Sequence, residues 1–555
     1  MSVATNWEYR FRGAHHPVRR LLSWVALAVA AAAVVLVVSA SWFVGTDAGA
    51  AFLAAFPAVP DQPPVPPGFP LYVRLAHAFN LLFMIFIIRS GLQILVDHPR
   101  LYTAIGSTPG SEWLRFRGPV PTDRLWTAKD DALPLSGWIG IPGRRHTVGL
   151  ARHWHFAMDI LFVVNGAAFV ALNLLSGQWA RLVPTTWEIV PQALSGLLLY
   201  ASLQDPSALA GVSGFERYNA LQQLTYFGVV FALAPLAILT GIAMSPAFDN
   251  RFRWYQRLFG NRQIARSLHF LIMCCFVLFI VVHIVMVIVT GLLPNLNHIT
   301  IGTDGTGVVG FWVAMAGLAV IAVLNVVASP LTWRYPRALQ HVSRWTVGIV
   351  MDLLFDRFAP RARYSRAEIS PYFWPNGLLP TSDEWTHLAE NGFRDYRLRV
   401  VGLVENPVEL TVADLVEMGT HQQITMHNCI QGWSGIAEWG GLPLRRLIEL
   451  VRPLPDARYL VFRSFGEGGE GGQYYDSHTM ADACHPDSLL AHEMNYAPLS
   501  DVHGAPLRLR VENQLGFKQV KWIRSVEFVA SLREAGEGEG GYNEDHEFYG
   551  YRAEI

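Results

Sequence analysis

The stretch Met426-His427-Asn428-Cys429-Ile430-Gln431-Gly432-Trp433-Ser434 decides how the second half of this 555-residue chain is interpreted. Its cysteine stands alone in a polar, turn-rich region, away from the long apolar runs of the first half. An unpaired cysteine beside a histidine and an asparagine is a buried small hydrophobe, a nucleophile or a metal ligand. The stretch itself leaves all three interpretations open, so the rest of the chain has to separate them.

The composition divides the chain between lipid and water. Hydrophobic residues make up 52% of it and charged residues only 16%. A soluble protein would carry about 25% charged residues, so part of the chain lies in membrane lipid, and its length implies at least two structural units. The net charge of −1 gives no indication of nucleic-acid binding. Four cysteines, Cys274, Cys275, Cys429 and Cys484, do not form a disulfide framework.

Six segments are apolar and long enough to cross about 30 Å of hydrocarbon. They lie near residues 21–44, 72–96, 155–175, 221–244, 268–292 and 308–330. The first follows Arg19-Arg20 and so has a feature of an export signal, but its apolar run of about 24 residues is too long for one. We therefore expect an all-α transmembrane bundle of six spans.

Arginine and lysine are concentrated in alternate loops. The tail 1–20 and the loops 97–154 and 245–267 are rich in them, whereas 45–71 and 293–307 carry none. Cytoplasmic loops are enriched in these residues. We therefore expect both termini, and with them the C-terminal half, on the cytoplasmic side.

One segment leaves this orientation open. The loop 176–220 contains a short apolar patch, Leu194–Ala201, which we expect to lie at the membrane surface. If the patch crossed the membrane, the count would become seven and the C-terminal half would be periplasmic.

Four histidines in the spans fall into two pairs by depth. His269 and His283 are 14 positions apart, close to four full helical turns, so they share a face about 21 Å apart along the axis. Alternating span directions place His77 level with His283, and His155 level with His269. Facing imidazoles are the usual axial ligands of b-type haem, although any one of them alone would be taken as a hydrogen-bonded histidine. His153 competes with His155, but about 200° of rotation separates the two.

Arg89 lies well inside the second span, where a charge needs a partner. It follows His77 by 12 residues, about 18 Å toward the inner side. We expect it to bind a propionate of the inner haem, and a snorkelling side chain is the alternative. The adjacent Ser90-Gly91 would let a macrocycle approach the helix backbone.

The region 70–292 resembles the di-haem cytochrome b subunits of formate dehydrogenases and nickel-iron hydrogenases. The resemblance rests on His77-Ala-Phe-Asn-Leu-Leu and on the helix from Arg266-Ser-Leu-His269 to His283. It implies two haem b groups, ligated by the four histidines, with one haem facing quinone. The chain departs from that family in a leading span, a long 97–154 insertion and a sixth span. We place this domain at 21–330.

Residues 331–368 connect the two halves and are rich in arginine. The run Val342–Phe358 alternates apolar pairs with polar residues at helical spacing. We expect an amphipathic helix on the anionic inner surface, in contact with membrane lipids. A solvated linker is the alternative.

From 369 to 535 the pattern changes to short β-like runs separated by turn signals. We expect strands at Tyr396–Val404, Ile424–Met426, Tyr459–Arg463, Leu507–Val511 and Ser525–Val529, and short helices at Val412–Met418, Leu444–Val451 and Ser488–Met494. This pattern predicts an α+β domain. Residues 536–555 form an acidic tail that begins with a glycine-rich hinge.

This half resembles the sulfite oxidase superfamily of molybdopterin enzymes, and within it the catalytic subunits of methionine-sulfoxide reductases. The motifs are Cys429-Ile-Gln-Gly-Trp433-Ser434, Gly441-Leu-Pro-Leu, His503-Gly-Ala-Pro506-Leu-Arg508 and Gly516-Phe-Lys518-Gln519-Val520-Lys521-Trp522. They follow one another in the order of the family. The resemblance implies that the thiolate of Cys429 ligates molybdenum, a role that suits a soft ligand.

The resemblance also implies a set of cofactor contacts. Carried over by motif, they are Asn376, Gly377, Ser464, His503, Arg508, Gln519, Val520 and Lys521. Arg508 and Lys521 suit the phosphate of the pterin, while His503 stands where the family has asparagine. His427, Tyr474 and Tyr475 are candidate catalytic groups beside Cys429. True sulfite oxidases have arginines after the cysteine, and Gln431-Gly432-Trp433 stands here instead, which counts against sulfite as substrate.

Together these expectations describe a molybdopterin-dependent oxidoreductase, multi-pass in a bacterial-type inner membrane. It would exchange electrons with quinone or quinol through two haems and transfer an oxygen atom, with an S-oxide or N-oxide as the first choice of substrate. Oxidation of sulfite or another sulfur compound, such as a small oxyanion, with the electrons passed to quinone is the alternative. A di-haem protein with a non-catalytic C-terminal module is the other alternative, and a homo-oligomer is left open.

Overall fold

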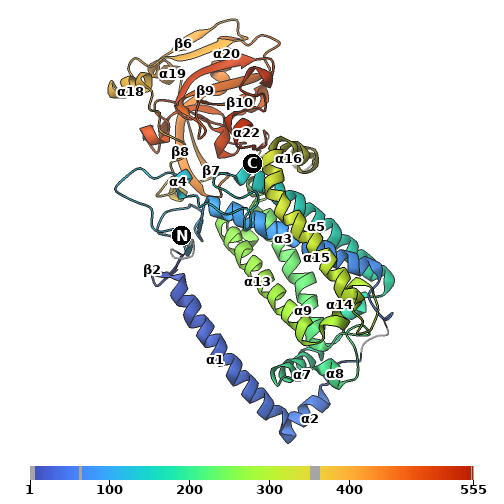
Figure 1. The fold of residues 1–555 in the computed structure, drawn as a ribbon. Helices are drawn as coiled ribbons and strands as arrows, with labels where there is room; N and C mark the ends of the chain where they lie inside the picture. Colours follow the sequence, from blue (N-terminus) through green and yellow to red (C-terminus); the bar gives the residue numbers. More distant parts are fainter. Residues whose placement is uncertain (1–6, 62–64, 350–362, 552, 554–555) are drawn as a thin grey trace.

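The computed structural model describes residues 7–61, 65–349, 363–551 and 553. It consists of a helical bundle and, above one end of the bundle, a domain rich in strands (Figure 1). Both ends of the chain lie toward that strand-rich domain (Figure 1).

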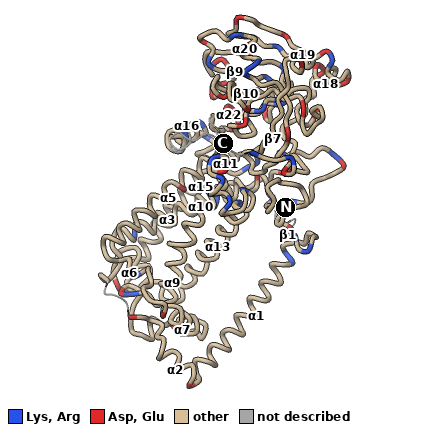
Figure 2. The backbone as a smooth tube through the Cα atoms, turned by 180° about the vertical axis from the view of Figure 1, so that it is seen from behind, with Lys and Arg blue, Asp and Glu red and all other residues tan. Residues whose placement is uncertain are grey.

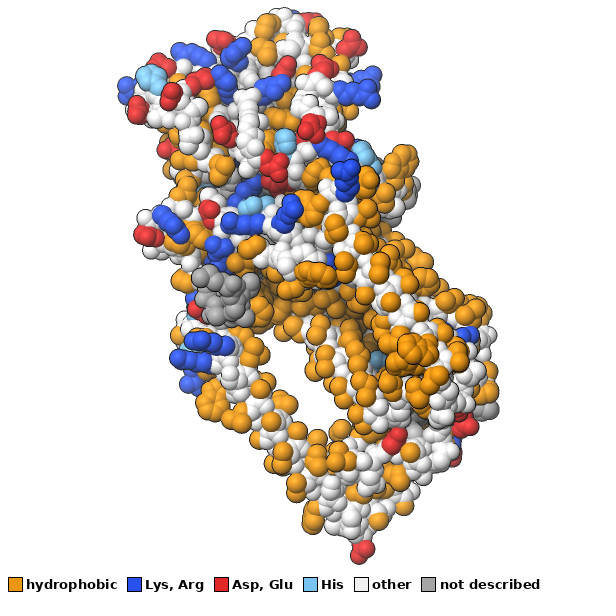
Figure 3. All heavy atoms as spheres, in the orientation of Figure 1, with side chains coloured by type: hydrophobic (Ala, Val, Ile, Leu, Met, Phe, Trp, Pro, Cys, Tyr) orange, Lys and Arg blue, Asp and Glu red, His pale blue; other side chains and the backbone are white. Residues whose placement is uncertain are grey.

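Six helices are long and apolar enough to span a membrane, as the sequence predicted. They are α1 (Val18–Val44), α3 (Leu71–Asp97), α5 (Val148–Ser176), the continuous run Ala220–Ala243 made of α9, η2 and α10, α13 (Arg262–Val289) and α15 (Val309–Arg334). Their outer surfaces are covered by hydrophobic side chains (Figure 3). This exposed apolar belt is what a lipid-facing bundle requires.

Shorter helices complete the bundle. They are α2 (Asp47–Ala55), α6 (Trp179–Leu182), α7 (Ile189–Ala201), α8 (Pro206–Leu209), α11 (Pro246–Arg251), α12 (Arg253–Leu258), α14 (Leu292–Thr300) and α16 (Pro336–Ser343). The apolar patch of the 176–220 loop is α7, whose 13 residues are too few to cross the hydrocarbon.

The leading span α1 stands apart from the rest of the bundle. Ala40 is its only buried residue among those described, and the space-filling view shows an opening between α1 and the other helices (Figure 3). The remaining spans pack together, most closely α3 against α5 and α10 against α13.

The long segment between α3 and α5 is folded around buried ion pairs. Its strands β3 (Arg100–Leu101) and β4 (Leu114–Arg115) join the N-terminal strands β1 (Glu8–Phe11) and β2 (Ala14–Pro17) in a sheet of order β2-β1-β4-β3. The fully buried Arg100 pairs with Asp131 at 2.7 Å and with Glu112 at 2.8 Å. The sequence indicated only a loop here, because residues distant along the chain supply the pairing.

The C-terminal domain has two five-stranded sheets. One has the order β10-β9-β14-β5-β6, and the other the order β12-β11-β8-β7 with β13 paired to β11. The strands are β5 (Leu398–Gly402), β6 (Val408–Leu410), β7 (His421–Asn428), β8 (Ser434–Pro443), β9 (Tyr459–Glu467), β10 (Gln473–Thr479), β11 (Leu489–Met494), β12 (Ala497–Pro498), β13 (Arg508–Arg510) and β14 (Ile523–Val529). The helices are α4 (Ala128–Asp131) from the membrane half, α18 (Asp383–Glu390), α19 (Val412–Glu417), α20 (Leu444–Val451), α21 (Met480–Ala483) and α22 (Tyr542–His546).

The predicted α+β domain is therefore confirmed, with one element wrong. The segment expected as a helix at Ser488–Met494 forms strand β11, which pairs with β8 and β13. Its leucines are good helix formers, but burial between two strands overrides that preference.

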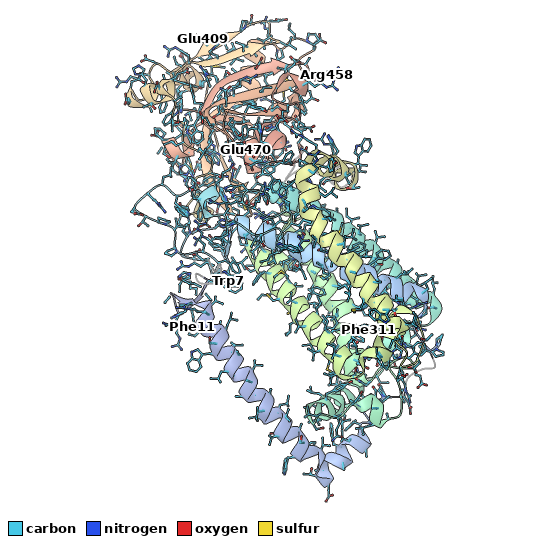
Figure 4. The ribbon with its side chains drawn as sticks, in the orientation of Figure 1. Trp7, Phe11, Phe311, Glu409, Arg458 and Glu470 are labelled. Atoms are coloured by element: carbon cyan, nitrogen blue, oxygen red, sulfur yellow. The ribbon has the colours of Figure 1, made fainter. Side chains whose placement is uncertain are left out.

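The acidic tail is packed rather than hinged. The Arg337 and Gln340 side chains of α16 donate to the main-chain carbonyl of Glu544, and Lys129 pairs with Glu547 at 2.7 Å. In Figure 4 the labelled Glu470 lies on the side of the domain nearer the bundle, where the tail reaches it, whereas Phe311 marks the opposite end of the helices. The expected amphipathic run Val342–Phe358 is helical through Gly348, and its part from 350 on lies outside the described residues.

Basic residues gather at the end of the bundle that meets the C-terminal domain (Figure 2). The N-terminal strands, the 97–147 segment and the start of α13 all lie at this end. The arginine-rich loops and the C-terminal domain are therefore on the same side of the helical bundle.

Candidate functional site

The four predicted histidines form two facing pairs of rings. The centroids of His155 and His269 are 6.4 Å apart, and those of His77 and His283 are 6.2 Å apart. A metal–imidazole bond of about 2 Å on each side, with the ring radius added, gives a centroid separation of about 6 Å. Both pairs therefore fit a metal ion bound between the rings, as in bis-histidine haem ligation.

Hydroxyl groups hold the pair nearer the C-terminal domain, His155 and His269. Nδ1 of His155 lies 2.9 Å from Oγ of Ser90, and Nδ1 of His269 lies 3.0 Å from Oγ1 of Thr240. Each hydroxyl gives its own proton to a carbonyl of its helix, at 2.7 Å in both cases. The imidazole must then donate from Nδ1, which leaves the lone pair of Nε2 for a metal.

A glycine follows each of these hydroxyl residues. A Cβ on Gly91 would lie 3.3 Å from Cε1 of His155, and a Cβ on Gly241 would lie 3.7 Å from Cε1 of His269. The sequence suggested that Ser90-Gly91 admits a macrocycle. In the structure the pair positions the His155 ring instead, and Thr240-Gly241 repeats the arrangement at His269.

Aromatic rings surround the far pair. Phe279 stacks on His283 at 5.5 Å with an interplanar angle of 19°, and the ring of Tyr226 lies 6.1 Å from His283. This surrounding differs from the hydroxyl support of the near pair.

Two expectations about the membrane half change. Arg89 donates to the carbonyls of Asn325 (2.8 Å) and Gly140 (3.1 Å) and to the side chains of Asn325 and Ser329. Its guanidinium thus ties α3 to α15 and the 137–140 turn, so the expectation that it binds a haem propionate is corrected. His153 contacts Oγ of Ser343 and the carbonyl of Phe548, which removes it as a competitor of His155.

Cys429 lies in the tight turn between β7 and β8. Its N–H donates to the carbonyl of Trp433 at 3.1 Å, and Gly432 adopts a φ of +111°, a conformation that favours glycine. The thiol is 2% exposed and lies 3.8 Å from Nδ2 of Asn376. Burial raises its pKa to about 12, so the thiolate requires a cation such as a coordinated metal.

A cavity of about 100 Å³ opens beside this turn. Nine of the predicted site residues line it: Asn376, Gly377, His427, Ser464, Tyr474, His503, Arg508, Gln519 and Lys521. They come from separate strands and turns, and the fold gathers them around one hollow.

Arg508 and Lys521 give the cavity a cationic wall. The Lys521 ammonium donates to the carbonyl of Val502 at 2.8 Å, and Arg508 donates to that of His503 at 2.9 Å, while its Nε is buried without a partner. Burial and mutual repulsion lower the pKa of Lys521 far below its usual value, and burial with the charge of Arg510 lowers that of Arg508. A bound phosphate would satisfy both groups, so these residues fit the pterin phosphate.

His427 is held in one orientation beside the cysteine. Nη1 of Arg510 donates to its Nδ1 at 3.0 Å, its ring stacks on Trp433 at 5.1 Å, and a Cβ on Gly516 would overlap it. Burial, with the charges of Arg510 and Arg508, holds its pKa well below the usual value. The ring is therefore neutral, and Nε2 carries its proton.

His503 also has both ring nitrogens engaged. Nδ1 lies 2.8 Å from Oγ of Ser500, and Nε2 lies 3.2 Å from the carbonyl of Phe373. Burial lowers its pKa to about 4. His503 is thus a neutral wall of the cavity.

Two predicted site residues point elsewhere. Tyr475 follows Tyr474 in β10, so its side chain is on the opposite face, where its hydroxyl donates to Asp545. The Val520 side chain is 1% exposed within the hydrophobic core. Both are corrected as side-chain contacts of the cavity.

Other lining residues were missed by the sequence reasoning. Lys129 comes from the membrane half, and Asn543 comes from the tail. No motif marks them, because only the packing of three distant segments brings them together. The aromatic run Phe373-Trp374-Pro375 before Asn376 was a usable signal.

The membrane half reaches the cysteine turn directly. Nε2 of Gln263, in the first turn of α13, donates to the carbonyl of Gly432 at 3.1 Å and to Oγ of Ser434 at 3.0 Å. Arg262 donates to the same carbonyl at 3.3 Å. The helix that carries His269 and His283 therefore begins at the turn that carries Cys429.

Comparison with known families finds a match in each half of the chain. Residues 386–535 match the family model described as oxidoreductase molybdopterin binding domain, and residues 68–302 match that of prokaryotic cytochrome b561. The C-terminal half thus contains a region that matches a molybdopterin-binding oxidoreductase domain, and the membrane half contains one that matches cytochrome b561.

Among curated proteins, one relative is a putative protein-methionine-sulfoxide reductase subunit YedZ1 of Azospira oryzae, 34% identical over 27% of this chain and 54% of that protein. Another is the protein-methionine-sulfoxide reductase catalytic subunit MsrP of Campylobacter jejuni, 30% identical over 26% of this chain and 52% of that protein. The chain thus spans about half the length of these relatives.

Among solved structures, the sulfane dehydrogenase SoxCD of Paracoccus pantotrophus is 26% identical over 25% of this chain and 39% of that one. Its TM-score of 0.23 carries no argument about the fold.

Proposed function

We propose that this protein is a membrane-bound molybdenum oxidoreductase that uses quinol to reduce an S-oxide or N-oxide. Two b haems, at His77/His283 and His155/His269, would carry electrons between the quinone pool and a molybdopterin centre ligated by Cys429. The overall reaction is R2SO + QH2 → R2S + H2O + Q, so the quinol supplies the two electrons and two protons that turn the transferred oxygen into water. Molybdenum supplies the oxygen-atom transfer when bound.

The observation that carries this proposal is the contact of α13 with the cysteine turn. His269 follows Gln263 by six residues, about 9 Å along the axis, and Gln263 bonds the Gly432 carbonyl three residues after Cys429. A C-terminal module without catalytic function would not require so short a connection to a histidine pair. The arrangement supports an electron path within one chain.

The residues of the cavity give the substrate its surroundings. Phe373, Trp433 and neutral His427 line the cavity. The two cations Arg508 and Lys521 are matched to the pterin phosphate. Gln431 bonds the main-chain carbonyls of Asp97 and Ala128 and so lies away from this cavity. Lys129 also lines the cavity, but it is paired with Glu547 at 2.7 Å. An uncharged S-oxide therefore suits this wall better than a sulfur oxyanion, which would need cations of its own.

We also propose that the molybdopterin domain lies in the cytoplasm. It meets the arginine-rich loops 97–147 and 245–267, which positive-inside reasoning assigns to that side. A reporter fused to the C-terminus tests this: a reporter active only in the periplasm should be silent, and its activity would overturn the orientation.

The decisive experiment is anaerobic reoxidation of the dithionite-reduced haems by a panel of S-oxides, N-oxides and nitrate. We expect rapid reoxidation by an S-oxide or N-oxide and none in Cys429→Ser, which retains its haems but lacks the metal ligand. Reduction of the haems by sulfite would instead show the reverse reaction. Molybdenum well below one atom per chain, from a host that makes the cofactor, would refute the enzyme function.

A further inference from the structure

Arginine side chains crowd the ends of α5 and α13 that face the molybdopterin domain. Arg152 precedes His155 by three residues, and Arg266 precedes His269 by three, so each arginine shares a helix face with its histidine. Arg262 lies about one further turn toward the domain. A cationic layer therefore covers the near histidine pair.

Arg152 has no counter-charge in this layer. Its half-buried guanidinium lies over the ring of Phe156, 5.1 Å from the centroid, and it forms no ion pair within the described part of the chain. The titratable groups that act on it are Tyr549 and Cys429, which carry no charge at neutral pH. A half-buried cation whose neighbours are neutral or, like Arg262, positively charged is a site for an anion.

Arg262 is 6% exposed and meets only carbonyl oxygens. It donates to Met244 at 2.9 Å and to Gly432 at 3.3 Å. Asp249 attracts it, but the two form no ion pair among the described residues, and Arg152 and Arg266 repel it. Arg262 is near enough to Arg152 for the two charges to repel, so both place positive charge in the same part of the layer.

Arg266 differs, because its guanidinium is already committed. It donates to the main-chain carbonyls of His98 and Arg100, each at 2.7 Å. These bonds fix the start of α13 against the 97–101 segment, so the role of Arg266 is structural. Both terminal nitrogens of Arg266 are thus bonded, whereas Nη2 of Arg262 has no hydrogen bond within the described part of the chain. The open cationic positions are therefore those of Arg152 and Arg262.

We propose that Arg152 and Arg262 bind the propionate carboxylates of the haem held by His155 and His269. Haem b carries both carboxylates on one edge. The cationic layer lies at the end of the near histidine pair that faces the molybdopterin domain, where that edge would meet it. The inference rests on the proposed haem function and deepens it by naming the residues that receive the anionic edge. It also assigns this role in place of Arg89, whose two terminal nitrogens are bonded to protein oxygens and which keeps only the buried Nε without a partner.

The site gives the haem edge a defined neighbour. Arg262 bonds the carbonyl of Gly432, in the same turn as Cys429. The two arginines thus connect a carboxylate of the haem to the turn that holds the molybdenum ligand. This sets the haem at His155/His269, rather than the one at His77/His283, as the electron partner of the molybdopterin domain.

The test is a potentiometric titration of the haems in purified wild-type protein, Arg152→Gln and Arg152→Lys. The near haem is identified as the one missing from His269→Ala. We expect its midpoint potential to fall in Arg152→Gln, because a nearby cation favours the ferrous state. The far haem should not change, and Arg152→Lys should restore most of the shift.

Arg257→Gln is the matched control, since it removes an exposed arginine on α12 at the same membrane surface. An unchanged near-haem midpoint in Arg152→Gln, with both haems retained, would overturn the inference while leaving the haem pairs intact. Wild-type protein with fewer than two haems would overturn the proposed function and this inference together. A shift that disappears when phospholipid is removed with detergent would assign the site to a lipid phosphate and also refute it.

Discussion

The two histidine pairs share their ring separation but differ in everything around them. His155 and His269 are each fixed by a hydroxyl and a glycine from a neighbouring helix, beneath a cationic layer and the cysteine turn. His77 and His283 lie among Phe279 and Tyr226 at the other end of α13. We propose that the similar ring spacing serves two partners: the near pair would exchange electrons with the molybdopterin centre, and the far pair with quinone dissolved in the surrounding lipid.

The largest expected effect comes from removing one histidine of either pair, because each substitution should remove one haem and leave the other. His269→Ala should remove the near haem and abolish quinol-linked substrate reduction, while the far haem remains and is still reduced by quinol. His283→Ala should remove the far haem, and reoxidation of the near haem by substrate after dithionite should persist. Haem content by pyridine haemochrome and stopped-flow spectra measure both, and retention of two haems in either variant would contradict the pairing.

A smaller effect is expected from the hydroxyl groups. Ser90→Ala and Thr240→Ala each remove the partner of an Nδ1 and should weaken binding of the near haem about 10–100-fold, the usual consequence of losing such support. Ser90→Thr is the control, because it keeps the hydroxyl. Haem retention during dilution gives the affinity, and equal loss of the far haem would mean that the bundle, rather than the pair, was damaged.

Gln263 tests the link between the near pair and the cysteine turn. Gln263→Leu removes two hydrogen bonds, each worth about 0.5–1.5 kcal/mol, and leaves the Gly432 carbonyl with Arg262 alone. We expect slower electron transfer from the near haem to substrate, with haem and molybdenum contents unchanged. An unaltered reoxidation rate would show that this contact has no part in the path.

The smallest effect should distinguish the two glycines. Gly91→Ala places a methyl group 3.3 Å from the His155 ring and should displace it, whereas Gly241→Ala leaves an ordinary contact of 3.7 Å at His269. The near-haem spectrum should therefore change in Gly91→Ala and hardly at all in Gly241→Ala. The opposite order would contradict these ring positions.

Much of the site followed from local pattern. The 14-residue spacing of His269 and His283 and the six apolar runs depend only on helix geometry and lipid thickness, and the structure brings the rings together as the depth argument expected. That the rings bind haem remains a prediction. Motif order led to seven of the nine predicted cavity residues, and His427 and Tyr474 were candidates for their chemistry. Alternation along β10 turns Tyr475 away from Tyr474, and Val520 packs in the core.

The sequence by itself determined the membrane spans, the histidine depths and the molybdopterin motifs, because each is written in periodicity or in a short contiguous pattern. Only the tertiary structure decided that Arg89 clamps helices, that Lys129 and Asn543 line the cavity, and that α13 begins at the turn of Cys429. These depend on contacts between segments from about fifty to several hundred residues apart, and no local pattern records which of many polar side chains will meet there.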